Sequence, residues 1–244
     1  MTFFTFPLNL ILALLWITAI LLSYRHAVDS KPVRFMLSPA ASIIAIALLA
    51  GFCIIIGLTG NRSIARSWAF IIVLFFFMTV LAFVLVRGWK AGGKPRWRFI
   101  LNHAGLLLAL SSAFWGAPDS EELRFQAFMD TPVREAYRMD GSRARLPYEI
   151  VLKDFDVRVS DDGTPSGFHA EVDVDGNPAV LTVNDPLSLS LAADLYLSSY
   201  DPESGEWCIF QLVREPWKYP ALAGIIMMLA GAALLFIQGP RKVR

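Results

Sequence analysis

Long apolar runs alternate with short polar segments along most of this chain, and one polar stretch is much longer than the others. Five apolar runs reach the roughly 17–25 residues that a helix needs to cross a bilayer. They cover about residues 3–22, 36–58, 68–86, 99–115 and 219–237. The pattern therefore predicts a polytopic α-helical membrane protein with five transmembrane helices.

The long polar stretch, residues 117–217, changes its pattern part of the way along. Within residues 119–138 the apolar side chains have a loose helical spacing, so we expect a helical start. From Leu146 onward the spacing becomes that of strands, and residues 168–174 alternate cleanly between apolar and polar. The expected organisation is a four-helix region (1–116), a small, mainly β domain (117–217), and a final helix with a basic tail (218–244).

Turn residues and a slip in the alternation add detail to the β domain. Asp161-Asp162-Gly163 and Asp175-Gly176-Asn177-Pro178 predict turns on either side of the alternating strand. In the strand 150–159 the apolar phase slips, which predicts a bulge at Lys153-Asp154. Further strands are expected at residues 179–183, 189–199 and 207–213.

Composition supports a membrane protein and excludes several other classes. Hydrophobic residues make up 55% of the chain and the mean hydropathy is +0.51. The formal net charge is only +1, so nothing calls for nucleic acid as a partner. Cys53 and Cys208 are too far apart in sequence for a CxxC redox pair, and Cys208 is most simply a buried apolar residue.

Basic residues cluster in alternate loops and so predict an orientation. If these loops face the cytoplasm, the β domain lies on the extracytoplasmic side of the cytoplasmic (inner) membrane. Arg62 and Arg66, in the second loop, are mild contrary evidence. The three basic regions contain Arg25, Lys31 and Arg34; Arg87, Lys90, Lys94, Arg96 and Arg98; and Arg241, Lys242 and Arg244.

His103 is the candidate functional residue, because an ionisable side chain at membrane depth is costly unless it is paired or bound. On a helix, Leu107, Leu110 and Phe114 share its face within about 40°, and a stripe of small residues lies opposite. That stripe, Gly105, Ala109, Ser112 and Gly116, would allow close approach of a neighbouring helix. We expect the His103 face to point outward from its own bundle, toward a partner helix or a flat apolar ligand.

Residue chemistry alone leaves several functions open for His103. It can be hydrogen bonded to a neighbouring helix, ligate a metal such as haem iron, or relay protons. No other titratable group lies well inside the predicted spans, which weakens the relay. Elsewhere, residues 173–177 resemble part of a calcium loop, but a hairpin turn explains them better. His169 is expected to be a solvated residue and His26 a plain interface residue.

Several sequence motifs resemble the ResB (CcsB) family of system II cytochrome c biogenesis. His-Ala-Gly-Leu-Leu-Leu-Ala-Leu at 103–110 is similar to the family's HxGLLL membrane segment, and residues 36–60 resemble its first core helix. Residues 183–186 and 195–201 are similar to its VNxPL and YxxYQSSYD signatures. Residues 211–218, which lead into the last span, resemble its VRDPW ending.

The chain also departs from this pattern, as a divergent or shortened member would. The span 3–22 precedes the usual core, and the soluble domain is short. Leu197 stands where the family usually has Gln, and Glu215 stands where it has Asp.

The resemblance implies a role in handling haem. It implies a subunit, itself non-catalytic, of a haem-transporting cytochrome c synthetase that exports haem and delivers it to apocytochrome c. His103 would supply one axial ligand to haem b, beside Leu107, Leu110 and Phe114, and a CcsA-type partner in the bilayer would supply a second histidine. A thioredoxin-like thiol reductase is a further implied partner.

Two other functions stay open at this point. The chain can be a scaffold that holds the CcsA-type partner without ligating haem. It can also be a membrane-anchored sensor, although its short cytoplasmic loops offer no domain to receive a signal.

Overall fold

A computed structural model of the chain describes residues 4–90, 97–159, 165–201 and 205–238. The chain divides into two compact units, one helical (Met1–Pro118 with Lys218–Arg244) and one of β-strands (Asp119–Trp217). The predicted turn at residues 161–163 lies outside the described residues, as do Lys94, Arg96, Arg241, Lys242 and Arg244.

The helical unit contains the predicted spans. Among the described residues, five helices are long and apolar enough to cross a membrane, which confirms the number expected from sequence. They are α1 (Leu8–His26), α3 (Pro39–Thr59), α4 (Trp68–Lys90), α5 (Trp97–Gly116) and α6 (Lys218–Gln238), with a short α2 (Lys31–Met36) and two 3₁₀ turns, η2 (Arg62–Arg66) and η3 (Ala117–Asp119). The largest difference from the prediction is in the first helix, which begins at Leu8 because Pro7 precedes it.

Local sequence explains the sharp ends of α3. The Ser38 hydroxyl accepts a hydrogen bond from the amide of Ala41 at 3.2 Å, and Pro39 occupies the first helical position. At the other end Gly60 adopts a left-handed conformation with φ of 63°, which ends the helix.

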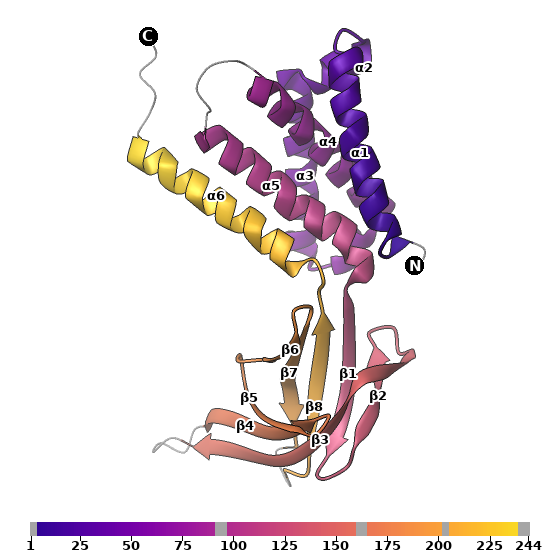
Figure 1. Ribbon diagram of the computed structural model, residues 1–244, viewed down its shortest axis with the longest axis vertical. Coiled ribbons are helices and arrows are strands. Elements are labelled where there is room, and N and C mark those ends of the chain that lie inside the picture. Colours follow the sequence, from indigo (N-terminus) through magenta and orange to yellow (C-terminus); the bar gives the residue numbers. More distant parts are fainter. Residues whose placement is uncertain (1–3, 91–96, 160–164, 202–204, 239–244) are drawn as a thin grey trace. The chain divides into compact units, whose positions relative to one another are not determined.

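Helices α5 and α6 pack closely along their small residues, and Figure 1 shows them side by side. A Cβ atom added to Gly105 would lie 2.6 Å from the carbonyl oxygen of Gly224, and one added to Gly224 would lie 2.6 Å from the amide nitrogen of Ala109. A Cβ at Gly231 would lie 2.6 Å from the side-chain nitrogen of Asn102. These positions must be glycine for the two backbones to approach this closely.

Polar side chains tie α1 to its neighbours. The buried Asn9 side chain donates a hydrogen bond to the carbonyl oxygen of Trp115 at 2.8 Å, which joins α1 to the end of α5. The Trp16 indole donates to the Thr79 hydroxyl at 3.2 Å, which joins α1 to α4. In an apolar surrounding such bonds hold the helices in one register.

The β unit is one antiparallel sheet of eight strands in the order β5-β4-β3-β2-β1-β8-β7-β6. Strand β5 also contacts β6 and β7, so the sheet curls until its two edges meet around one core (Figure 1). The largest fully buried side chains of this core include Phe210, Leu123, Ile150 and Leu152. The strands are β1 (Glu121–Phe128), β2 (Val133–Arg138), β3 (Arg143–Val159), β4 (Pro165–Val174), β5 (Asn177–Thr182), β6 (Leu187–Ser190), β7 (Ala193–Tyr200) and β8 (Trp207–Arg214).

The predicted helical start of the β domain is wrong. Residues 119–138 form the two strands β1 and β2 after one 3₁₀ turn. Leu123, Phe125 and Ala127 are buried at every second position, and the residues between them are exposed. This two-residue period places one face of β1 on the core, and β1 pairs along its whole length with β8.

The later part of the β domain agrees more closely with the prediction. The register of β3 against β4 shifts between Leu152 and Asp154, which confirms the bulge predicted at Lys153-Asp154. Asp175 and Gly176, with φ of 49° and 84°, form the two-residue turn of the β4–β5 hairpin. The single strand predicted at 189–199 is instead β6 and β7, because the chain turns at Leu191 and Ala192, whose amide donates to the Ser190 hydroxyl.

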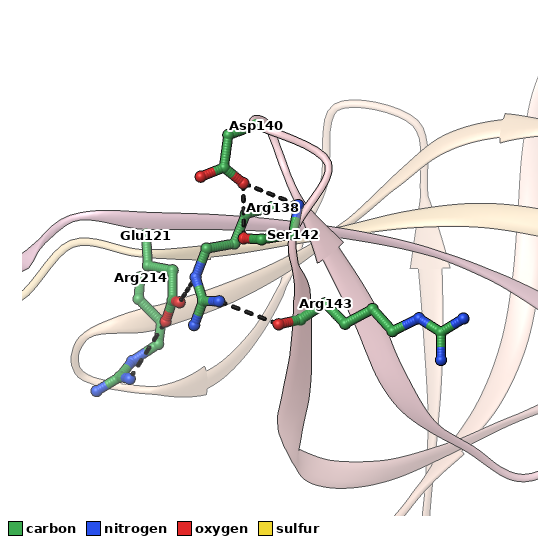
Figure 2. A network of polar contacts seen from close by, with 6 residues as sticks. All are labelled: Glu121, Arg138, Asp140, Ser142, Arg143 and Arg214. Carbon is green, nitrogen blue, oxygen red and sulfur yellow. Dashed lines mark hydrogen bonds and ion pairs between the residues drawn. The ribbon is translucent and has the colours of Figure 1, made fainter.

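Two polar contacts fix the strands at which the chain enters and leaves the β unit. The Trp217 indole donates a 2.7 Å hydrogen bond to the Asp119 carboxylate. Glu121 on β1 accepts an ion-paired hydrogen bond from Arg138 of β2 at 2.8 Å and lies 3.7 Å from Arg214 of β8 (Figure 2). One carboxylate thus links three neighbouring strands.

We expect Gly224→Ala to destabilise the helical unit by about 1–3 kcal/mol, because the new methyl group forces α5 and α6 apart. Gly57→Ala in α3 is the matched control, since a Cβ there meets nothing within 4 Å. The measurement is thermal unfolding of both purified variants in detergent. Equal unfolding temperatures would contradict the close contact.

The buried Cys208 gives a pH dependence of known sign. Burial raises the pKa of its thiol from 9.0 to about 12. Between these values the unfolded chain releases a proton that the folded chain keeps, so the free energy of unfolding decreases as the pH rises from about 9 to about 12. We expect Cys208→Ala to flatten this decrease in denaturant unfolding at pH 8 to 11. Cys53→Ala is the control, and an unchanged slope in Cys208→Ala would contradict the assignment.

Candidate functional site

His103 lies in the first half of α5, half-buried, against one ring and one carbonyl of its own helix. Its Nδ1 atom lies 2.9 Å from the carbonyl oxygen of Phe99, and its ring stacks on the Phe99 ring with centroids 4.0 Å apart. The Phe99 ring in turn covers Gly88 of α4, where a Cβ would overlap it. The imidazole is therefore held from one side by Phe99.

This hydrogen bond determines which imidazole nitrogen is available for binding. A carbonyl oxygen can only accept, so Nδ1 carries the proton in the neutral ring and donates to Phe99. The lone pair is then on Nε2, and no group among the described residues hydrogen bonds to that atom. A backbone carbonyl that fixes the tautomer in this way is the usual arrangement behind a metal-ligating histidine.

The three apolar residues predicted to share the His103 face do share that face of α5, but two of them pack inside the chain. Leu107 packs against the buried cluster that contains Ile20 of α1 and Phe83 of α4. The Phe114 ring lies 5.8 Å from that of Phe75 of α4. Leu110 is half-buried.

The expectation that this whole face points outward is therefore wrong at Leu107 and Phe114. The physical reason is that α4 and α1 of the same chain cover it there. His103 and Leu110 are half-buried, as Leu107 and Phe114 are, and the Phe99 ring beside His103 contacts α4 at Gly88.

The site offers one protein ligand and little else for a metal ion. Among the described residues, no group of three His, Cys, Asp or Glu side chains lies close enough to hold one. A single imidazole suits a metal that brings most of its own ligands, as haem iron does with four porphyrin nitrogens. The described residues thus fit haem better than a bare ion.

Sequence reasoning missed the ring that positions His103 and an aromatic cluster near the other end of α5. The four-residue spacing of Phe99 and His103 was a usable signal, since such side chains meet on a helix. The Trp115 ring centroid lies 6.4 Å from that of Trp16 and 6.3 Å from that of Phe75. No sequence period reveals this cluster, because it joins three helices.

The other candidates have ordinary surroundings. Residues 173–177 form a hairpin end, where the Gly176 amide donates to the Asp173 carboxylate, as the turn interpretation predicts. His169 is half-buried on β4, opposite Asp156 of β3 and Thr182 of β5. Neither position gathers the groups that a metal site needs.

Comparison with known proteins gives one sequence match and one structural likeness. Residues 90–206 match the sequence model of the ResB-like family. A search of curated proteins gave no match. Among solved structures, cytochrome c heme lyase CcmF is similar with a TM-score of 0.42 and 15% sequence identity, over 81% of this chain and 34% of that one. The chain thus spans about a third of the length of that structure.

Proposed function

Since the chain is ResB-like over residues 90–206, we propose that it is a subunit of a membrane complex that exports haem and delivers it to apocytochrome c. The observation that carries the proposal is the His103 side chain, which lies within the matched residues and has Nδ1 held by a backbone carbonyl and Nε2 available. The sequence motifs at 36–60 and 211–237 lie outside that match and remain predictions.

In the proposed mechanism haem is a cargo and not a resident cofactor. The Nε2 atom of His103 would provide one axial ligand, and a histidine of a CcsA-type partner would provide the other. Phe99 would keep the imidazole plane in place, and Leu110 would contact the apolar ring edge. The thioether chemistry on apocytochrome c would take place at the partner, so this chain itself would be non-catalytic.

The orientation in this mechanism is the one predicted from the charged loops. The basic loops would face the cytoplasm, and the helices would cross the inner membrane. The β unit would then face the extracytoplasmic side, where apocytochrome c is found. Within the β unit a thiol reductase finds no exposed thiol, because Cys208, its one cysteine, is fully buried in the core.

A scaffold role is the second candidate, and one observation favours it. Leu107 and Phe114 pack on α1 and α4, so they offer less surface to haem than the helical face alone suggests. In that case His103 would be a structural residue hydrogen bonded to its own helix, and the chain would only hold its partner.

We expect His103→Ala to lower the amount of haem that co-purifies with the complex by at least tenfold. A loss of this order is typical when a group that supports a metal ligand is removed, and removal of the ligand itself should cost no less. Added imidazole should restore it, because the free ring can occupy the vacated position. The measurement is the absorption spectrum of the purified complex, where two axial imidazoles give a low-spin signature. Unchanged haem content in His103→Ala would overturn the site.

His169→Ala is the matched control, since it removes a half-buried histidine of the β unit. It should leave both the haem content and its spectrum unchanged. If His103→Ala matures cytochrome c as well as His169→Ala does, the scaffold role is correct and haem ligation is not.

A further inference from the structure

The β unit is strongly acidic but carries a basic hairpin. Residues 119–217 contain twenty acidic and eight basic side chains, a net charge of −12. Five of the eight basic side chains lie on β1, β2 and the start of β3. These are Arg124, Arg134, Arg138, Arg143 and Arg145. Basic side chains gathered in one place despite an acidic surrounding need an explanation.

Part of this cluster is used within the fold. Arg138 is occupied by Glu121 and also donates to the backbone carbonyl of Arg143 at 3.2 Å. At the hairpin turn, hydrogen bonds from Ser142 lower the pKa of the Asp140 carboxyl. These contacts hold the β2–β3 hairpin in one shape (Figure 2).

Arg143 and Arg145 are not used in this way. Both side chains are exposed, and among the described residues neither makes an ion pair, although acidic side chains outnumber basic ones by more than two to one in this unit. Figure 2 shows the Arg143 guanidinium directed away from the Glu121 network. The two guanidinium groups are therefore available to an outside anion.

These two arginines line a shallow cavity of about 450 Å³. Arg143 and Arg145 are two residues apart on one strand face, so their Cα atoms lie roughly 7 Å from each other. Arg134, Glu135 and Ala144 complete the lining. Arg134 is already paired with Glu149 at 2.8 Å, so its charge is largely offset and the free guanidinium groups of the cavity are those of Arg143 and Arg145.

The net charge of the unit restricts what can bind there. At physiological salt a charge is felt over only about 8 Å, so a small anion senses the local arginines. A large acidic protein would instead meet the surrounding carboxylates and be repelled. Two guanidinium groups at this spacing suit two carboxylates carried by one small ligand, because each can form a forked ion pair.

We propose that the β2–β3 hairpin binds the paired carboxylates of a porphyrin through Arg143 and Arg145. The choice of a porphyrin rests on the proposed function, in which haem with its two propionates is the cargo. The cavity would hold the propionate edge only, which requires no metal ligand from the β unit.

The test uses metal-free protoporphyrin IX as the probe, since it keeps both propionates and has no iron for His103 to ligate. Binding is followed by porphyrin fluorescence with the full-length chain in nanodiscs of uncharged lipid. We expect Arg145→Gln to weaken binding on the order of fivefold, as fits an exposed ion pair. Lys153→Gln removes the same charge from the same strand outside the cavity, and it should leave binding unchanged.

A second arm leaves the protein intact and changes the ligand. Protoporphyrin IX dimethyl ester lacks the carboxylates and should bind the unaltered chain as weakly as the free acid binds Arg145→Gln. Equal binding of ester and acid, or equal effects of Arg145→Gln and Lys153→Gln, would overturn the proposal. Haem ligation is tested by the haem content of His103→Ala, and this site by binding of the iron-free probe to Arg145→Gln, so a failure of one and a failure of the other are distinguishable.

Discussion

The close contact between α5 and α6 determines which way His103 points. Gly105 and Gly224 allow the two backbones to meet with no room for a Cβ atom, and this fixes the rotation of α5 about its own axis. His103 lies two positions before Gly105, about 200° around the helix, and therefore on the side away from α6. Helices α1 and α4 then contact that side at Leu107 and Phe114, and His103 is half-buried beside its stacked Phe99.

Much of the architecture could be predicted because its signals are local. A bilayer requires long apolar runs, so all five candidate spans were visible in the sequence. The bulge near Lys153 follows from a slip in the apolar alternation of its strand. The turn at Asp175-Gly176 requires residues that tolerate a left-handed backbone. In both cases a few neighbouring residues specify the feature. The start of the β domain was mistaken because Phe128 and Met129, at helical spacing from Phe125, hid a two-residue period that only pairing with β8 makes decisive.

The candidate site was predictable in its residues but not in its surroundings. Helical geometry correctly put His103, Leu107, Leu110 and Phe114 on one face. It could not tell that Phe75 and Phe83 of α4 meet two of these residues, because contacts between helices far apart in sequence leave no period in either. The orientation of the imidazole depends on a single carbonyl four residues back, and its tautomer follows from that contact.

The half-buried position of His103 is consistent with a cargo site more than with a permanent cofactor site. A resident haem is normally enclosed by side chains that exclude water and is held by ligands from one chain. Here one chain offers one imidazole, and part of the adjoining apolar surface is already occupied by its own helices. A ligand held by one bond from each of two chains stays on one chain when the bond to the other breaks, so a shared hold favours transfer between chains. The arginines of the β2–β3 hairpin would hold a porphyrin with a similarly weak grip, because exposed ion pairs form and break readily in water.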